Sequence, residues 1–437
     1  MKKLILLVYI IYAALPASDA QAESYLNGTG DPNDPYLIED LADFDAFASD
    51  PNYWAAGVHT KLMCDPNLSG RTYTTAVIAP DTDNQDDVFD GISFAGIFDG
   101  NVHNICNVTI DPNGVGNDFL GLFGYIDSGA EVKNINIEDV IVIGGNNSEH
   151  IGGLCGHNDG SISNCYSNSS VIGIYSPSSL GGLCGGNNGN IVNCNSTGSV
   201  TGGGYYVGGL CGSNGGNIIN CYANNLVSSA GPGSGVGGLC GSSCGYISNC
   251  YSTGPVTGSV FSSYVGGLCG LNNCNWRLFG TISNCYSTSP VSGGLERIGG
   301  LLGDVSGSIN NSFWDIEIGG PDNGVGIPKT TLEMQDPNTF ISAIWDFVGE
   351  TINGTDNYWR LCKDGIEYPK LAWQSMMGDI ACPDGVNLFD YAYFAERWLE
   401  DDCDTSNNCG GADIDTSGIV GIADAVILAE NWLEGTE

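Results

Sequence analysis

Short hydrophobic phrases separated by glycine and asparagine recur along the middle of the chain. The phrase Gly-Gly-Leu-Cys-Gly begins at residues 152, 181, 208, 237 and 266, and Gly-Gly-Leu-Leu-Gly begins at 299. The copies are evenly spaced, except that the last step is longer than the others. In most copies a second phrase, Ile-x-Asn-Cys-Tyr, follows the first, and a third phrase that contains Val-x-Gly comes after it. A regular period of this length predicts a stack of repeated structural units.

Each period predicts one coil of an all-β parallel β-solenoid, with about 28–29 residues and three short strands per coil. Such strands are too short to stand alone, but stacking pairs each strand with its copy in the next coil, ~4.8 Å away. We expect two interior columns, Leu154, Leu183, Leu210, Leu239, Leu268 and Leu301, and Ile162, Ile191, Ile218, Ile247, Ile282 and Ile309. We expect an asparagine stack at one corner, made by Asn164, Asn193, Asn220, Asn249 and Asn284. The Gly-Gly pairs and β-branched residues disfavour a helical repeat.

Ten of the 18 cysteines follow the period, as the pairs 155/165, 184/194, 211/221, 240/250 and 269/285. Two interpretations are open: two columns of buried thiols that pack as small apolar groups, or a disulfide across each coil. Stacking of equivalent cysteines suits disulfides poorly, which favours the thiols. Cys244 and Cys274 lie outside the pattern in adjacent coils, and we expect an inter-coil disulfide between them.

The N-terminus has the pattern of a secretory signal peptide, with Lys2-Lys3, an apolar run at 4–15, and Ala20-Gln21-Ala22. We expect cleavage after Ala22 and a secreted, extracellular or cell-surface protein without a transmembrane segment in the mature chain. The chain has 12 Lys+Arg against 50 Asp+Glu, a formal net charge of −38. This charge argues against binding to nucleic acid or to an anionic membrane.

The repeat phrases resemble the GLUG motif of bacterial secreted and surface proteins, over roughly residues 95–315. The resemblance implies a β-solenoid and export, and it implies no defined activity. We expect a signal peptide at 1–22, an N-terminal cap at 23–94, the solenoid at 95–311, a tryptophan-rich C-terminal cap or connector at 312–378, and a further module at 379–437. Within the N-terminal cap we expect a strand at 35–38 and a short helix after Asp40.

That last module contains one phrase twice, at 391–400 and 425–434, and each copy is amphipathic at helical spacing. A twelve-residue loop before the second copy places oxygen-bearing residues at the positions that bind Ca²⁺ in calcium loops. We expect the metal ligands to be Asp413, Asp415, Ser417, the carbonyl of Ile419, and Asp424. The alternative is an acidic loop that binds no ion.

The duplicated loop and helix, with Asp at position 12, resemble a type I dockerin, which implies a cohesin-like or cell-surface protein partner. The first copy departs from the dockerin pattern, because its places for the first two ligands fall at Ile380 and Cys382. We expect Cys382, Cys403 and Cys409 to brace this copy by a disulfide. Leu388-Phe389 and Ile422-Ala423 are apolar where cohesin-binding dockerins often carry polar residues.

No catalytic constellation is visible in the sequence. None of the four histidines begins a His-Glu-x-x-His motif, and we interpret His150 and His157 as solvated turn residues. We therefore predict a non-enzymatic interaction or adhesion module with a calcium-binding tether. The alternative is a polysaccharide-active β-helix enzyme or an accessory carbohydrate-binding subunit. Glycan binding has some support from aromatic residues predicted at turns, which are Tyr205, Tyr206, Phe261, Tyr264 and Trp276.

Overall fold

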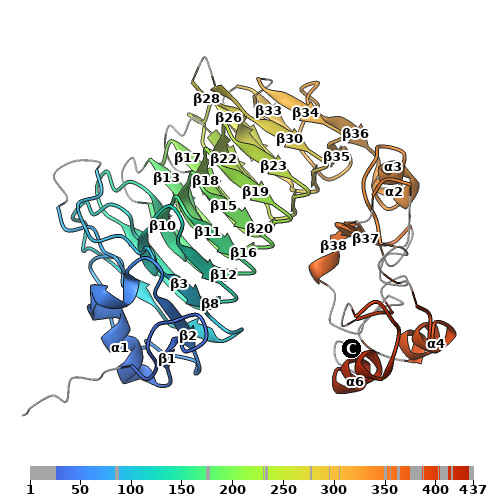
Figure 1. Ribbon diagram of the computed structural model, residues 1–437. Helices are drawn as coiled ribbons and strands as arrows, with labels where there is room; N and C mark the ends of the chain where they lie inside the picture. The colour runs from blue at the N-terminus through green and yellow to red at the C-terminus, as the bar shows by residue number, and fades with distance from the viewer. Residues whose placement is uncertain are drawn as a thin grey trace, which may run out of the picture.

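The computed structural model describes residues 26–432, except 84–87, 174–177, 230, 232–234, 276–277, 295, 305, 349–351, 355, 362–364, 375–385, 387, 402, 404–411 and 415–416. Its main body is the predicted all-β parallel β-solenoid, with about seven turns of ~29 residues. Figure 1 shows the strands stacked along one axis, with the two helices α4 and α6 near the C-terminus.

Four parallel sheets run along the solenoid. The first contains β1 Tyr36–Ile38, β2 His59–Leu62, β3 Ile97–Asp99, β7 Glu131–Lys133, β11 Ser161–Ser163, β15 Asn190–Val192, β19 Asn217–Ile219, β23 Tyr246–Ser248, β30 Thr281–Ser283 and β34 Ser308–Asn310. The second contains β6 Phe123–Ile126, β10 Cys155–Asn158, β14 Cys184–Asn187, β18 Cys211–Asn214, β22 Cys240–Ser243 and β27 Cys269–Leu271.

The third sheet contains β4 Asn104–Cys106, β5 Thr109–Ile110, β8 Asn136–Gly144, β12 Tyr166–Gly173, β16 Asn195–Gly202, β20 Tyr222–Ser229, β24 Tyr251–Ser252, β25 Val256–Gly258, β31 Tyr286–Ser287, β32 Val291–Gly293, β35 Phe313–Asp315 and β36 Ile327–Lys329. The fourth contains β9 Ile151–Gly152, β13 Ser179–Gly181, β17 Tyr206–Gly208, β21 Gly235–Gly237, β26 Tyr264–Gly266 and β33 Ile298–Gly299. Two antiparallel pairs lie outside these sheets, β28 Asn273–Asn275 with β29 Leu278–Phe279 and β37 Trp359–Arg360 with β38 Lys370–Leu371.

The helices are few and short. They are α1 Leu41–Ser49, α2 Thr331–Met334, α3 Pro337–Ile341, α4 Leu388–Glu396 and α6 Ile422–Glu430, with 3₁₀ turns at Pro51–Trp54 and Ala372–Gln374. Within the described residues no helix is long and apolar enough to cross a membrane.

A complete repeat has four strands, so the prediction of three was wrong. The Gly-Gly-Leu-Cys-Gly phrase does not form one strand, because the chain bends at Gly182 and Leu183 between β13 and β14. At Gly181 a Cβ atom would lie 2.0 Å from the carbonyl oxygen of Cys184 and 2.8 Å from Cα of Cys211 in the next coil. Only glycine fits this corner, which is a reason for the glycine doublet to recur.

The interior consists of columns of like side chains. Both predicted aliphatic columns are confirmed: Ile162 pairs in register with Ile191, and Ile191 with Ile218. All six leucines of the other column are fully buried. Because burying one aliphatic side chain contributes roughly 1.5–3 kcal/mol, repetition of the columns supplies most of the stability of the coils.

The ten periodic cysteines are free thiols and all are buried, which confirms the thiol interpretation. Cys155 pairs in register with Cys184, and Cys184 with Cys211. In the second column the backbone N–H of Cys165 donates to Sγ of Cys194 at 3.4 Å. Burial raises the pKa of Cys184 and Cys211 well above the ordinary thiol value, so these thiols stay protonated and unreactive.

Cys244, outside the two columns, is disulfide-bonded. The inter-coil bridge predicted for it agrees with that state. The side chain of its proposed partner Cys274 lies outside the described residues, so the pairing itself stays a prediction.

Asparagines stabilise the coil corners in two ways. The five predicted corner asparagines have φ values of 50° to 54°, a left-handed conformation that asparagine tolerates better than most residues. The predicted stack is present where Asn193 donates to Asn164 and Asn164 to Asn134, both at 3.1 Å. A second, buried ladder was not foreseen: Asn158 donates to Asn187 and Asn187 to Asn214, both at 2.7 Å.

Residues at the N-terminal end both cover the solenoid and extend it. The strand predicted at 35–38 is β1, which adds to the first sheet through β2. The helix predicted after Asp40 is α1, and the Asp40 carboxylate caps it by accepting two backbone N–H groups. Phe44 and Phe47 of α1 are fully buried in the core. The strand and helix predicted for this segment are therefore confirmed.

The tryptophan-rich segment after the repeats divides into two parts. Trp314 belongs to β35 and packs in the solenoid core. Trp345 and Trp359 form a separate cluster with Tyr251 and Tyr286, which lie on the outer face of the third sheet. This segment therefore covers one side of the last coils.

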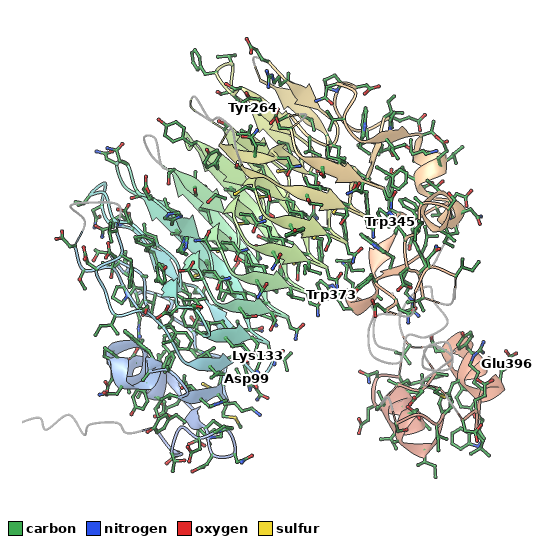
Figure 2. The ribbon with its side chains drawn as sticks, turned by 45° about the horizontal axis from the view of Figure 1, so that its top comes forward. Asp99, Lys133, Tyr264, Trp345, Trp373 and Glu396 are labelled. Carbon is green, nitrogen blue, oxygen red and sulfur yellow. The ribbon has the colours of Figure 1, made fainter. Side chains whose placement is uncertain are left out.

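The contact with the side of the solenoid reaches back over several coils. Tyr222, Tyr251 and Tyr286 stack with ring centroids 5.0 and 4.9 Å apart. The indole of Trp373 donates to the carbonyl of Asn220 at 2.9 Å. Figure 2 shows Trp345 and Trp373 on this side of the molecule.

Candidate functional site

The C-terminal tail is duplicated in structure as it is in sequence. α4 and α6 are the two copies of the amphipathic helix. Val386 and Phe394 of the first copy occupy the same places as Val420 and Leu428 of the second, and all four share one small core. An antiparallel bridge between Asp401 and Ile419 also joins the copies.

The predicted calcium loop leads directly into α6. Asp413 is 1% exposed, and its Oδ1 and Oδ2 accept the backbone N–H groups of Ser417 at 3.0 Å and Gly418 at 2.9 Å. Gly418 has a φ of 89°, which turns the loop sharply at the position expected to be glycine. The Ser417 hydroxyl donates to the carbonyl of Ile419 at 3.3 Å.

The other end of the loop supplies a second buried carboxylate. Asp424 is fully buried, and its Oδ2 accepts the N–H of Gly421 at 2.8 Å. Asp415, the remaining predicted ligand, lies outside the described residues. Among the described side chains no three His, Cys, Asp or Glu residues converge as a metal-binding group.

The residues of this loop fit a hard cation. Asp413 is buried, and no cationic side chain contacts it within the described part of the chain; a buried carboxylate without a compensating charge is costly. Carboxylate, hydroxyl and carbonyl oxygens are the donors that Ca²⁺ prefers.

The first copy keeps the aspartate that corresponds to the end of the predicted calcium loop. Asp390, the counterpart of Asp424, is 1% exposed. The places for the first two ligands, Ile380 and Cys382, lie outside the described residues. Cys403 is disulfide-bonded, as the proposed brace requires, while Cys382 and Cys409 also lie outside the described residues.

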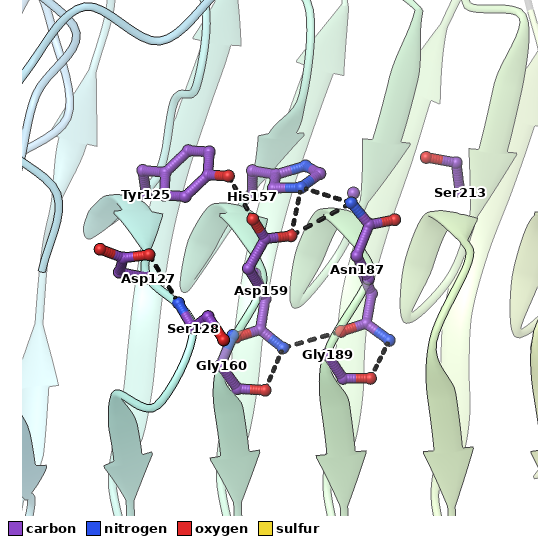
Figure 3. Close-up of polar contacts among 12 residues, drawn as sticks. Tyr125, Asp127, Ser128, His157, Asp159, Gly160, Asn187, Gly189 and Ser213 are labelled. Carbon is purple, nitrogen blue, oxygen red and sulfur yellow. Dashed lines mark hydrogen bonds and ion pairs between the residues drawn. The ribbon is translucent and has the colours of Figure 1, made fainter. Parts of the chain in front are cut away.

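A second group of polar side chains lies on the second sheet, on its outer face (Figure 3). Tyr125 donates a hydrogen bond to Asp159 Oδ2. Oδ1 of Asp159 lies 3.2 Å from His157 Nε2, and Asn188 Nδ2 lies 3.1 Å from both atoms. The rings of His157 and His150 are 4.7 Å apart.

The expectation that these two histidines are solvated was wrong. His157 is buried, and the Nδ1 atoms of both rings are buried without a hydrogen-bond partner. Burial lowers the pKa of His150 to about 3, and burial also lowers that of His157 although Asp159 opposes the shift. Both rings therefore stay neutral, packed on Phe119 and Tyr125. This cluster is part of the packing.

The aromatic residues considered for glycan binding occupy the fourth sheet and its turns. Tyr205 and Phe261 are 54% and 63% exposed. Tyr206 and Tyr264 both pair in register with Gly235, so they stand two strands apart in one column. Trp276 lies outside the described residues.

Sequence reasoning missed a group of charged side chains in the first coils. The strand register places Lys61 of β2 beside Asp99 of β3, and Asp99 beside Lys133 of β7. Both of these steps along the chain are longer than the regular period. The sequence contains a signal for this alignment in the triplets His-Thr-Lys, Ile-Phe-Asp and Glu-Val-Lys. In each triplet, as in Ser-Ile-Ser of the later coils, the first and third side chains face outward and the second faces the core.

The coils also match a known sequence family. The model of "The GLUG motif" matches residues 147–172, 176–201 and 203–228. The chain contains GLUG-motif repeats. Each matched segment contains one asparagine of the corner stack and most of one turn of the solenoid, so the GLUG motif is the coil itself.

Two curated relatives match part of the chain. Halomucin from Haloquadratum walsbyi is 32% identical over 153 residues, which is 33% of this chain. A protein of Evansella cellulosilytica named "Putative Gly-rich membrane protein" is 30% identical over 163 residues, which is 37% of this chain. The alignments span only 2% and 17% of these relatives. Neither name is that of an enzyme.

One solved structure is similar in outline. It is described as a "putative immunoglobulin A1 protease from Bacteroides ovatus" and is 21% identical, with a TM-score of 0.47 over 80% of this chain and 99% of that chain. At this level of similarity the match carries no argument about activity.

Proposed function

We propose that this protein is an exported, non-enzymatic interaction module in which GLUG coils form the scaffold and the C-terminal loop binds Ca²⁺. The observation that carries the proposal is the pair of buried carboxylates, Asp413 and Asp424, at the two ends of a loop turned at Gly418. The ligands are these two residues with Asp415, Ser417 and the carbonyl of Ile419. The ion neutralises their charge and fixes the start of α6.

The proposed location is outside the cell, in secreted or surface-bound form. The N-terminal signal pattern supports export. The printed names of the relatives, a halomucin and a membrane protein, support a place at or beyond the cell surface. Ten buried free thiols are compatible with an oxidising compartment, because the coils shield them from oxidants.

The tail is the proposed docking point for a cohesin-like or cell-surface protein. Both copies of the duplicated phrase leave apolar side chains exposed at matching positions: Leu388 and Ile422 are 71% and 74% exposed, and Trp398 and Trp432 are 42% and 38% exposed. Exposed apolar residues gathered on one small unit are typical of a protein interface.

Calcium titration tests the proposal. Isothermal titration calorimetry of the calcium-free full chain should give a binding isotherm that Asp413→Asn and Asp424→Asn each weaken by about tenfold or more. Asp139→Asn, an exposed aspartate in the coils, is the matched control and should leave the isotherm unchanged. Identical isotherms for all four proteins would remove calcium from the proposal.

The alternative of a carbohydrate-binding or polysaccharide-active subunit rests on the partly exposed aromatic column at Tyr206 and Tyr264. Such rings can stack on sugar faces. Incubation with plant and bacterial polysaccharides should release no reducing ends. Their release, and its loss on boiling the protein, would replace the non-enzymatic proposal.

A further inference from the structure

A pocket lies on the outer face of the first sheet, close to the N-terminal end of the solenoid. Its volume is about 400 Å³, within the range of small-molecule sites. The lining residues come from the three strands β2, β3 and β7 and from the segment before β1. They are His59, Thr60, Lys61, Ile97, Asp99 and Lys133, with Pro32 and Pro35 at one side. Figure 2 shows Asp99 and Lys133 next to each other at this end.

Lysine side chains are concentrated here in a protein that has few of them. The formal net charge is −38, and two of the four lysines that the structure describes line this pocket. Lys133 pairs with Glu131 at 3.2 Å. Lys61 is half-buried, and its ammonium group makes no hydrogen bond or ion pair within the described residues. An ammonium group held in a pocket without a partner favours an anionic ligand.

The register arranges the polar groups as donor, acceptor and donor. Lys61 and Lys133 stand on either side of Asp99, so their strands are about 10 Å apart. Oδ1 of Asp99 is fixed by the N–H of Asn101 at 2.9 Å and by Nδ2 of Asn134 at 3.0 Å. Its Oδ2 has no partner among the described residues. The Asp99 carboxylate is thus held in place with one oxygen available to accept a hydrogen bond.

The apolar residues that line the pocket also restrict which ligands fit it. Ile97 is partly exposed beside His59, and Pro35 is partly exposed at the edge. A ligand that fits must present C–H groups on one face and hydrogen-bonding groups at its rim. A phosphate or sulfate ion lacks the apolar face, and a longer polyanion would be repelled by the acidic flanks of the chain.

We propose that this pocket binds a sugar acid, a small ligand with one carboxylate and several hydroxyl groups. The carboxylate accepts a charge-assisted hydrogen bond from Lys61. A ring hydroxyl donates to Oδ2 of Asp99, a second ring oxygen accepts from Lys133, and the C–H face of the ring lies against Ile97 and Pro35.

The first coils alone carry this arrangement of charges. The column that contains Lys61, Asp99 and Lys133 continues through the next coils with uncharged residues, which are Ser163, Val192 and Ile219. The site is therefore local to the N-terminal end and is not repeated along the solenoid.

Calorimetric titration of the full chain with D-glucuronate and D-glucose tests this proposal, because the two sugars differ only in having a carboxylate or a hydroxymethyl group at C6. D-galacturonate is titrated as a second sugar acid. We expect at least one of the two acids to bind about tenfold or more tightly than glucose. Lys61→Met should abolish this preference, Lys61→Arg should keep it, and Asp99→Asn should weaken binding of the acid.

Lys370→Met is the matched control, since Lys370 is an exposed lysine on β38, and it should bind as the unmodified protein does. Asp413→Asn should also retain sugar binding, which separates this site from the calcium loop. Circular dichroism melting of each variant establishes that the coils remain folded. The proposal is overturned if neither acid binds at millimolar concentration, if glucose binds equally well, or if folded Lys61→Met retains the preference.

Discussion

Two parts of this chain repeat themselves, and they do so in different ways. In the GLUG coils, copies one period apart stack by translation, so that Cys155, Cys184 and Cys211 form a column. In the tail, the two copies pack against each other, and Val386 and Val420 meet in one small core. A stack extends its core with every copy added, whereas a pair of copies has only the core that the two can share.

The two parts also differ in what they bury. Leucine, isoleucine, valine and thiol columns fill the interior of the coils. The tail has a much smaller apolar core and buries three carboxylates, those of Asp390, Asp413 and Asp424. The coils bury carboxylates as well, but Asp304 there pairs with Arg297 at 3.3 Å. The difference teaches that repetition alone stabilises the coils, while the tail, in our proposal, depends on a cation to offset buried negative charge.

The largest effect is expected from removing one member of a column. Leu210→Ala leaves a cavity between coils that the neighbours above and below cannot fill, and should lower the free energy of unfolding by about 2–5 kcal/mol. Urea unfolding followed by circular dichroism measures it. Leu226→Ala is the control, because Leu226 is 51% exposed and its loss should cost about 0.5 kcal/mol or less. Equal effects of the two variants would contradict the column as the source of stability.

For each unit of pH, a smaller effect is expected from acid. His150 and His157 are neutral in the folded protein because burial lowers their pKa values, that of His150 to about 3. Below pH ~6.5 the unfolded chain binds protons that the folded chain does not, so stability falls with decreasing pH. Each histidine lowers the free energy of unfolding by up to about 1.4 kcal/mol for each unit by which the pH falls, until the pH reaches the pKa of that histidine in the folded protein.

Urea unfolding midpoints between pH 7 and pH 4 test this pH dependence. His150→Phe keeps the contact with Phe119 and removes one titrating group, so its midpoint should fall less steeply than that of the unmodified protein. Parallel profiles for the two proteins would show that His150 does not carry the dependence.

The smallest change is expected when the native protein is treated with a thiol reagent. The ten column thiols are buried, so the reagent cannot reach them in the folded coils. Burial also raises the pKa of Cys184 and Cys240 well above the ordinary value, whereas at Cys221, where burial acts in the same direction, hydrogen bonds with Cys194 and Cys250 lower the pKa to about 5. Ellman's reagent should therefore leave the ten column thiols unmodified in the native protein and modify them only after unfolding in urea. Mass spectrometry of the labelled peptides identifies the positions. Rapid native labelling of any column cysteine would mean that the coils open readily.

The coils could be predicted from sequence because each column repeats one residue type at a fixed spacing. Leu183 and Ile191 were placed inside correctly, and the free state of the periodic cysteines followed from stacking. The fourth strand was missed because the bend at Gly182 interrupts a phrase that reads as continuous.

The sites were harder to predict, because side chains that meet in space come from phrases that differ. Lys61, Asp99 and Lys133 share a column only through the strand register, and their spacing departs from the period. His150 and His157 looked solvated because polar residues flank them in the sequence, yet His157 lies in β10, and Phe119 and Tyr125 cover the two rings. The loop ending at Asp424 could be proposed as a calcium site because the spacing of its oxygen-bearing residues is local, and its metal binding stays a prediction.

Hydrogen exchange followed by mass spectrometry, with and without calcium, tests the division between coils and tail most directly. Removal of calcium should speed exchange in peptides covering 413–432 and leave peptides covering 151–287 unchanged. Asp413→Asn should show the fast tail exchange even with calcium present. The account is contradicted if the tail exchanges at the same rate in both conditions, or if the coils lose protection when calcium is removed.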